Sequence, residues 1–269
     1  MRAIYVAGVL DVFMENNIWP DGVIGVSAGA IHGSVYLGNQ PGRTIRYYKK
    51  YCRHPKFMSF WSLLTTGSLV GTRFCYRDLP ERLDPFDYDT FRECGIPYYA
   101  VCTELQSGKA VYRRCTDLRR EMDYLRASAS MPYVSRPVKA EGKLLLDGGV
   151  ADSIPLDAFR KMGYTRNVVV LTRCKGYRKR PQSYKTARLF YKKFPQFVQA
   201  IANRHTVYNE SLRLVEELER AGEVLVLRPS EDLGIKRMEK DPARLQAQYE
   251  LGRRDAEAAL EKIKAFMNQ

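Results

Sequence analysis

A serine in a glycine-flanked turn is the first feature of this sequence that suggests covalent chemistry. The pentapeptide Gly25-Val26-Ser27-Ala28-Gly29 matches the pattern Gly-x-Ser-x-Gly. A strand-like apolar run precedes it and a helix of small residues follows, so the segment predicts a nucleophile elbow with Ser27 at its apex. Such a turn directs the N–H groups of the helix N-terminus at the reacting atoms. The alternative is an ordinary tight turn with a serine that faces solvent.

A nucleophilic serine needs a base, and the chain has three histidines, His32, His54 and His205. In the chain order of α/β-hydrolases, which is Ser, acid, His, the residues Ser27, Asp147 and His205 form a formal triad. His205, however, lies in a stretch that predicts a helix and not a loop after a last strand. A polar packing or capping role is therefore the other interpretation of His205.

A carboxylate is the alternative base. Asp147 ends a short apolar run and is followed by Gly148 and Gly149, which allow the chain to bend so that the carboxylate points across the sheet edge. Since sites in parallel sheets gather at the carboxyl ends of strands, we expect Ser27 and Asp147 at the same edge. An aspartate with a pKa of about 3.9 is a weak base unless burial raises that pKa. The alternative role of Asp147 is that of a turn residue or helix cap.

Alternating helices and strands would position these residues. The apolar spacing and the prolines predict helices over residues 4–16, 28–38, 44–52, 118–129, 155–162, 184–221 (with a break at Pro195) and 242–267. Short apolar runs predict strands over residues 22–26, 98–103, 110–115, 143–146, 168–172 and 223–227. Residues 56–72 have little periodicity and predict a cap or loop. Strands separated by helices favour a mostly parallel sheet that is covered on both faces.

The positive charge of the chain is concentrated in one segment. The 269 residues include 44 Lys and Arg against 30 Asp and Glu, a formal net charge of +14. No acidic residue lies between Asp157 and Glu210, an interval with 13 basic residues. Within it, residues 175–193 interleave basic and aromatic side chains, which is typical of a packed helix with solvated charges, of a surface that meets anionic phospholipid head groups, or of a nucleic-acid surface. No nucleic-acid-binding module is recognisable, so we expect no nucleic-acid partner.

The cysteines and the apolar runs bear on the compartment. None of the six cysteines forms a CxxC pair or a Cys/His cluster, so we expect free thiols, a reducing compartment and no metal. The start does not match a signal peptide, and the longest uncharged run, residues 22–42, is too interrupted by polar residues and glycines for a membrane span. The sequence therefore predicts a cytoplasmic protein, with residues 175–193 as the place of a peripheral contact with an anionic membrane.

Several segments together resemble the patatin-like phospholipase family, nearer its bacterial cytoplasmic branch than the plant storage proteins. The matching segments are residues 1–11, 25–29, 126–132, 147–149, 208–212 and 228–230. The resemblance implies a three-layer α/β/α sandwich with a mostly parallel central sheet, formed as a single domain over residues 1–269 with a basic helical C-terminal half from about residue 175. It also implies a Ser–Asp dyad that hydrolyses phospholipids or other lipid esters through an acyl-enzyme, with Ser27 as nucleophile, Asp147 as general base and no cofactor.

One part of the family pattern differs in this chain. The family usually carries a strand and a glycine-rich loop before its first helix, and that loop supplies N–H donors to the oxyanion. Here Arg2 matches the basic position of the loop and Ala3 replaces its last glycine, and the sequence begins partway through the motif. Either the true start lies further upstream, or this form lacks the preceding strand and glycines. The residues expected to form the oxyanion site and the elbow are Arg2, Ala3, Gly25, Ala28, Gly29, Gly148 and Gly149. The alternative is a weakly active or inactive relative that binds an anionic membrane or a partner.

Overall fold

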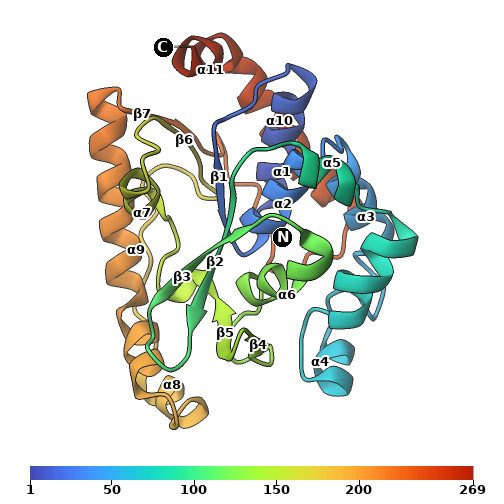
Figure 1. Cartoon of the computed structure of the whole chain (residues 1–269), viewed down its shortest axis with the longest axis vertical. Coiled ribbons are helices and arrows are strands. Elements are labelled where there is room, and N and C mark those ends of the chain that lie inside the picture. Colours follow the sequence, from blue (N-terminus) through green and yellow to red (C-terminus); the bar gives the residue numbers. More distant parts are fainter. Residues whose placement is uncertain (269) are drawn as a thin grey trace.

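In the computed structural model, which describes residues 1–268, two sheets lie between layers of helices (Figure 1). The first sheet has the strands β1 (Val23–Val26), β2 (Tyr98–Glu104), β3 (Ala110–Cys115), β4 (Val138–Ala140) and β5 (Lys143–Asp147). The second sheet has β6 (Asn167–Val170) and β7 (Val224–Leu227). All six cysteines are free thiols.

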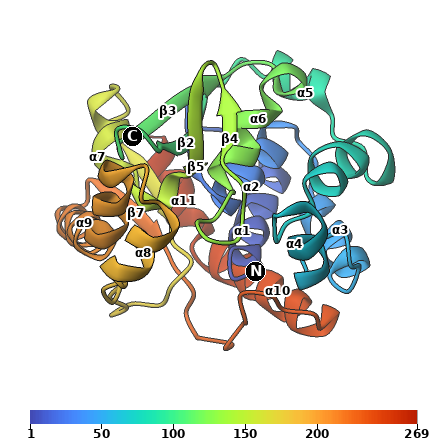
Figure 2. The ribbon, with the colours of Figure 1, turned by 90° about the horizontal axis from the view of Figure 1, so that it is seen from below.

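Helices cover both sides of the sheets, as Figures 1 and 2 show. One layer contains α1 (Ile4–Glu15), α2 (Ala28–Leu37), α6 (Leu118–Ser128), α10 (Pro242–Ala258) and α11 (Leu260–Met267). The other layer contains the 3₁₀ turn η2 (Gly148–Val150), α7 (Leu156–Lys161), α8 (Tyr184–Phe190) and α9 (Pro195–Ala221). Outside α1 and α2 lie α3 (Arg43–Tyr51), α4 (Phe60–Thr66), the π-helix η1 (Phe74–Leu83) and α5 (Tyr88–Glu93).

Adjacent residues of the strands supply apolar side chains to opposite layers. In β5, Leu145 joins the core cluster under α1, α2 and α6, whereas Leu146 joins the cluster under α8 and α9. In β7, Leu225 packs with the first cluster and Val224 with a cluster under α7 and α9. Because successive side chains of a strand point to opposite faces, this alternation requires helices on both sides. The three-layer α/β/α fold class is therefore confirmed.

The strand directions are parallel for β1–β2 and β6–β7 and antiparallel for β2–β3, β2–β5 and β4–β5. The antiparallel pairs include two hairpins with short connections. In the β4–β5 hairpin, Glu141 and Gly142 both have positive φ (46° and 77°), the combination that a tight hairpin turn requires. The parallel pairing that the sequence predicts thus occurs in β1–β2 and in the second sheet.

The first helix is held by the last long helix. Gly8 of α1 and Gly252 of α10 lie where a Cβ would be 2.1 Å from the carbonyl oxygen of Tyr249 and Tyr5, respectively, so the two backbones approach as only glycine permits. The hydroxyl of Tyr249 also donates to Asp11 Oδ2 at 2.6 Å. The C-terminal region therefore packs directly on the segment that leads into β1 and Ser27.

Most of the predicted elements are present, but several stretches differ. The segment predicted as a cap or loop over residues 56–72 contains α4, and η1, α5 and β4 fall in stretches where no element was predicted. The predicted helix over residues 242–267 is interrupted at Ala259 and forms α10 and α11. The predicted break at Pro195 is confirmed, since it separates α8 from α9.

Candidate active site

Ser27 occupies a strained turn between β1 and α2. Its backbone has φ 57° and ψ −125°, a conformation that non-glycine residues rarely adopt. Gly25 permits the turn, because a Cβ there would lie 2.6 Å from the backbone N and Cα of Ala30. Gly29 makes no such close contact, since a Cβ there would meet nothing within 4 Å. The elbow geometry predicted from the pentapeptide is present, and Gly25 is the glycine that it requires sterically.

Asp147, at the end of β5, lies beside Ser27. Ser27 Oγ donates a hydrogen bond of 2.7 Å to Asp147 Oδ2, and Gly149 N donates one of 2.8 Å to Asp147 Oδ1. The Asp147 side chain is buried, with 4% of the residue exposed. Gly148 allows the turn after Asp147 to approach β2, because a Cβ there would lie 2.2 Å from the carbonyl oxygen of Val101. Both carboxylate oxygens are therefore held in place, one of them by the hydroxyl of Ser27.

The surroundings of Asp147 raise the pKa of its carboxyl group. Burial is the main cause, while the hydrogen bond from Ser27 and the positive charge of Arg204 act in the opposite direction. A raised pKa makes the carboxylate a better proton acceptor than an aspartate in water. This is the condition that an aspartate must meet to act as a base on a serine hydroxyl.

Two further residues fix the backbone of the site. Thr103 Oγ1, on β2, donates to the carbonyl oxygen of Asp147 at 2.9 Å and accepts from Ala151 N at 3.2 Å. Ser128 Oγ, at the last turn of α6, accepts a hydrogen bond of 2.9 Å from Ser27 N. Neither Thr103 nor Ser128 was among the residues expected at the site, although Ser128 lies within the segment 126–132 that carries part of the family resemblance.

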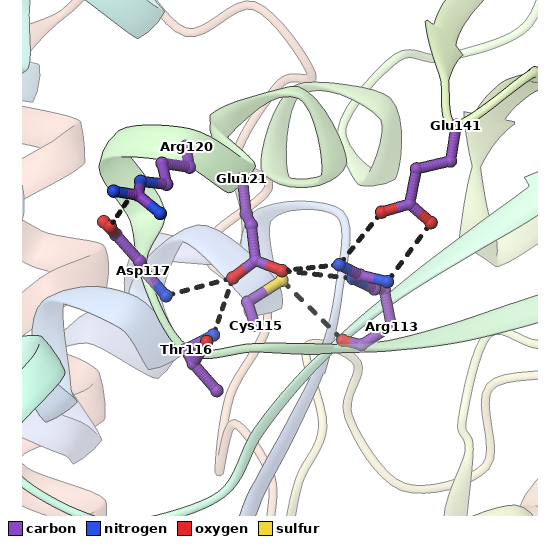
Figure 3. A network of polar contacts seen from close by, with 7 residues as sticks. All are labelled: Arg113, Cys115, Thr116, Asp117, Arg120, Glu121 and Glu141. Carbon is purple, nitrogen blue, oxygen red and sulfur yellow. Dashed lines mark hydrogen bonds and ion pairs between the residues drawn. The ribbon is translucent and has the colours of Figure 1, made fainter.

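A polar network fixes the start of α6, the helix that carries Ser128 (Figure 3). The carboxylate of Glu121 accepts hydrogen bonds from the N–H groups of Thr116 (2.7 Å) and Asp117 (3.0 Å). The same carboxylate pairs with Arg113 at 2.8 Å. These bonds satisfy N–H groups at the start of the helix that have no intrahelical partner and tie α6 to β3.

The first turn of α2 presents a free N–H group beside Ser27. The N–H of Ala28 has no acceptor among residues 1–268 and follows the nucleophile position directly. Ala28 and Ala3 line the same cavity as Ser27, whereas Arg2 borders a second, small cavity together with Arg173. Of the expected oxyanion residues, Ala28 and Ala3 thus face the cavity at Ser27.

An apolar cavity of about 200 Å³ opens beside Ser27. Its walls come from α2, α3, η1, α6 and the segment before α4. The apolar and aromatic residues that line it include Ile31, Val35, Tyr47, Tyr48, Phe57, Met58, Val70, Leu79, Leu118, Met122 and Leu125. Such a lining suits an aliphatic chain and not a polar ligand.

The three histidines have other surroundings. His205 Nδ1 lies 2.9 Å from the carbonyl oxygen of Ala202, within α9. The His54 ring stacks on Phe74 at 4.7 Å. His32 is buried, its ring nitrogens have no hydrogen-bond partner among residues 1–268, and burial lowers its pKa to about 3. The structure thus brings Ser27 into contact with Asp147 and leaves the formal triad without a bond between Asp147 and His205.

Within residues 1–268, no group of three or more His, Cys, Asp or Glu side chains is arranged to bind a metal ion. None of the helices in the same range has the length and apolar character needed to span a bilayer.

Comparison with known proteins places this site in a family. Residues 1–160 match the model of the patatin-like phospholipase family, and residues 194–268 match that of a domain of unknown function, DUF6363. The chain is 27% identical over 260 residues to the uncharacterized protein YjjU of Escherichia coli (strain K12), covering 94% of this chain and 72% of that protein.

Two further relatives match a smaller share of the chain. The uncharacterized NTE family protein Rv1063c of Mycobacterium tuberculosis is 25% identical over 150 residues, which are 55% of this chain and 40% of that protein. The neuropathy target esterase sws of Drosophila melanogaster is 26% identical over 168 residues, which are 61% of this chain and 11% of that protein. Because the patatin-like model covers 160 of the 269 residues, the chain belongs to the patatin-like phospholipase family.

Proposed function

We propose that the protein is a serine acyl hydrolase that cleaves lipid esters, with Ser27 as nucleophile and Asp147 as general base. The observation that carries this proposal is the 2.7 Å hydrogen bond from Ser27 Oγ to Asp147 Oδ2 beside an apolar cavity. Membership of the patatin-like phospholipase family and the similarity to an esterase support lipid esters as the substrate class.

The proposed acylation step uses both members of the dyad. Asp147 Oδ2 accepts the proton of Ser27 while Ser27 Oγ attacks the ester carbonyl, which gives a tetrahedral intermediate with an oxyanion. The intermediate collapses, the bond to the alcohol oxygen breaks, and that oxygen takes the proton from Asp147. The acyl group is then bound to Ser27 Oγ, with its chain in the apolar cavity.

The oxyanion is proposed to lie at the N-terminus of α2. The free N–H of Ala28 and the positive end of the helix dipole would stabilise its charge. Ser27 N is not proposed as a donor, because it is bonded to Ser128 Oγ. Ala3, which lines the same cavity, is the candidate for a second donor.

Deacylation repeats the same chemistry with water. Asp147 takes a proton from the water molecule that attacks the acyl carbonyl, and the bond from carbon to Ser27 Oγ then breaks. The proton returns from Asp147 to Ser27 Oγ, and the fatty acid leaves. Each proton is accounted for by one carboxylate, so the proposed reaction requires no histidine.

A fluorophosphonate probe tests this proposal directly. Wild-type protein should become labelled at Ser27, and Ser27→Ala should not react. Ser34→Ala is the matched control, because Ser34 is the other serine that lines the cavity and its hydroxyl is bonded to the Ile31 carbonyl oxygen at 2.8 Å. An unlabelled wild-type protein would favour the inactive relative, and equal labelling of Ser27→Ala would remove Ser27 from the mechanism.

We further propose that residues 175–193 make a peripheral contact with an anionic membrane. Ala187 and Tyr191 are buried, but Leu189 and Phe190 of α8 are 76% and 59% exposed. Across the same end of the molecule, α4 exposes Phe60, Trp61 and Leu64 directly after the cavity-lining residues 57 and 58 (Figure 1). Exposed apolar side chains beside lysines and arginines are typical of an interfacial surface.

Vesicle sedimentation tests the membrane contact. Binding should require anionic lipid and fall with added salt, since exposed charges are screened beyond about 8 Å at physiological ionic strength. Lys192→Glu with Lys193→Glu should weaken it. The same charge change on α11, Lys262→Glu with Lys264→Glu, is the control, because α11 lies at the opposite end of the molecule (Figure 1). Binding that does not depend on lipid charge would contradict the proposed contact.

A further inference from the structure

Five basic side chains from separate segments of the chain gather near the Ser27–Asp147 dyad. Arg2 precedes α1, Arg173 and Lys179 follow β6, Arg204 lies on α9, and Arg237 lies between β7 and α10. Arg2 and Arg173 line one small cavity, and Arg237 lines the apolar cavity together with Ser27. We call these five residues the cationic cluster.

The cationic cluster adjoins the catalytic turn. Arg204 Nε donates to the carbonyl oxygen of Gly149, and a Cβ on Gly149 would lie 3.2 Å from Arg204 Nη2 and 3.0 Å from Asp147 Oδ1. Lys179 Nζ lies 3.5 Å from Ser153 Oγ, which itself donates to the carbonyl oxygen of Gly149. An ester bound at Ser27 with its chain in the apolar cavity would therefore have its alcohol part close to these cations.

The side chains of the cationic cluster are not held in ion pairs. Among residues 1–268, none of the five side chains forms an ion pair, whereas nearby Arg178 and Arg244 are paired with Glu216 and Glu239 at 2.9 and 3.1 Å.

Two acidic residues influence the cluster electrostatically, Asp232 at Arg2 and Asp147 at Lys179 and Arg204. Burial, followed by the charges of Arg204, Arg173 and Arg237, lowers the pKa of Lys179 to about 7, against the opposing effect of Asp147. Glu231 and Asp232 line the small cavity together with Arg2 and Arg173, and Glu231 is paired with Arg254 outside the cluster. Four arginines and the partly protonated Lys179 therefore outnumber the nearby carboxylates of Asp147, Glu231 and Asp232, which leaves a positive charge that a bound anion would offset.

Aromatic rings and an asparagine amide, and not carboxylates, position the residues of the cationic cluster. The guanidinium carbon of Arg173 lies 4.3 Å from the ring centroid of Tyr177, and Lys179 Nζ lies 4.1 Å from that of Tyr208. The backbone of Lys179 exchanges two hydrogen bonds with the Asn209 amide, at 2.8 and 3.0 Å. This support orders the cations while leaving their donors open to a ligand.

We propose that the cationic cluster binds the phosphate group of a phospholipid whose acyl chain occupies the apolar cavity. Phosphate suits the site because arginine donors match its oxygens in pairs and because its negative charge offsets the cluster. The inference rests on the proposed hydrolase function and narrows its substrates to phosphate-bearing lipid esters over neutral ones of the same chain length.

Binding to the non-reacting variant Ser27→Ala tests the phosphate site without turnover. By calorimetry, octyl phosphate should bind at least about tenfold more tightly than octanol, the gain expected for charge-assisted hydrogen bonds. Arg173→Gln and Arg237→Gln should each weaken octyl phosphate binding about tenfold on the same grounds. Arg213→Gln is the control, because it removes one exposed arginine from α9 outside the cluster.

Three outcomes of the binding experiment would contradict the proposed phosphate site. Equal binding of octyl phosphate and octanol, or equal effects of Arg173→Gln and Arg213→Gln, would overturn the site. If inorganic phosphate binds as tightly as octyl phosphate, the cluster recognises free phosphate, and the lipid assignment is wrong.

Rates of ester hydrolysis distinguish a failure of the phosphate site from a failure of the proposed hydrolase activity. With wild-type protein, kcat/KM should be higher for a lysophosphatidate than for the monoacylglycerol of the same chain. Arg173→Gln and Arg237→Gln should reduce this ratio, and Arg213→Gln should not. If neither ester is cleaved but octyl phosphate still binds, the hydrolase proposal fails and the phosphate site stands. If both esters are cleaved equally well, the phosphate site fails and the hydrolase stands.

Discussion

The backbone N–H of Ser27 donates a hydrogen bond of 2.9 Å to the hydroxyl of Ser128, 101 residues further along the chain. Ser128 is fully buried in the last turn of α6. The nucleophile of the proposed dyad is thus held from two sides, with its side chain bonded to Asp147 and its backbone bonded to α6. The backbone of Ser27 is strained, and without the bond to Ser128 the turn would relax and move Ser27 away from Asp147. The bond from Ser27 N to Ser128 Oγ therefore positions the nucleophile.

Ser128→Ala should therefore impair both stability and turnover. It leaves the Ser27 N–H without its acceptor, which costs about 1–3 kcal/mol of unfolding free energy for a buried donor. Ester kcat should fall about tenfold, as expected for a small displacement of a positioned group. Ser130→Ala is the control, since the Ser130 hydroxyl donates only to the Arg126 carbonyl oxygen at 2.7 Å. Equal kcat values for Ser128→Ala and Ser130→Ala would show that the bond to Ser27 does not position the nucleophile.

Asp147→Asn should lose activity and gain stability at high pH. Turnover should fall by about 10²–10⁴, the usual contribution of a general base. Burial raises the folded-state pKa of Asp147, so the folded protein binds this proton more tightly than the unfolded chain. The contribution of Asp147 to stability is therefore lost as pH rises from its ordinary pKa through the raised value.

The melting temperatures of wild type and Asp147→Asn test this argument. The variant lacks the titrating group, so the difference in Tm between the variant and the wild type should grow in favour of the variant as the pH rises above about 4, the ordinary pKa of an aspartate. A difference that stays constant over this range would mean that the pKa of Asp147 is not raised. Wild-type kcat/KM should rise with pH through the same pKa, because only the ionised carboxylate accepts the proton.

The two glycines of the elbow should respond differently to alanine. Gly25→Ala places a Cβ 2.6 Å from the backbone of Ala30, which cannot move without disturbing α2, so unfolding free energy should fall by about 1–3 kcal/mol or more. Gly29→Ala meets no atom within 4 Å and lies in the first turn of α2, so its stability should be unchanged or higher. Urea unfolding of both variants measures this contrast. Equal losses of unfolding free energy would mean that the elbow requires both glycines equally.

The features that the sequence predicts correctly are those that short local patterns determine. The pentapeptide around Ser27 and the two glycines after Asp147 each specify a turn, and both turns are present where they were expected. The helix break at Pro195 follows from the missing N–H of proline in the same local way. The contact between Ser27 and Asp147 was predicted because both turns end strands of one sheet.

The parts that escaped prediction depend on long-range contacts. α4 is short, and apart from Ser62 its residues are not buried, so no apolar periodicity marks it. The bond from Ser27 to Ser128 and the bonds of Thr103 link segments that are 44 to 101 residues apart, and no local pattern predicts which residues meet across that separation. The cationic cluster likewise comes from four separate segments. The basic and aromatic segment 175–193 supplies only Lys179, and the four arginines lie elsewhere in the chain.

The shape of the apolar cavity leads to a last prediction, on chain-length preference. Met122 on α6 lines the cavity and is partly buried, so Met122→Trp should shorten the space for an acyl chain without creating a void. If the larger ring displaces two or three methylene groups, the loss is about 2 kcal/mol, because each buried methylene contributes about 0.8 kcal/mol. For a p-nitrophenyl dodecanoate, kcat/KM should then fall about 30-fold. For p-nitrophenyl acetate, whose acyl group ends close to Ser27, kcat/KM should change little.

Arg120→Trp is the control for Met122→Trp. It adds the same ring to the exposed face of α6 and should leave kcat/KM for both esters unaffected. Equal losses for dodecanoate and acetate in Met122→Trp would mean that the chain does not enter this cavity.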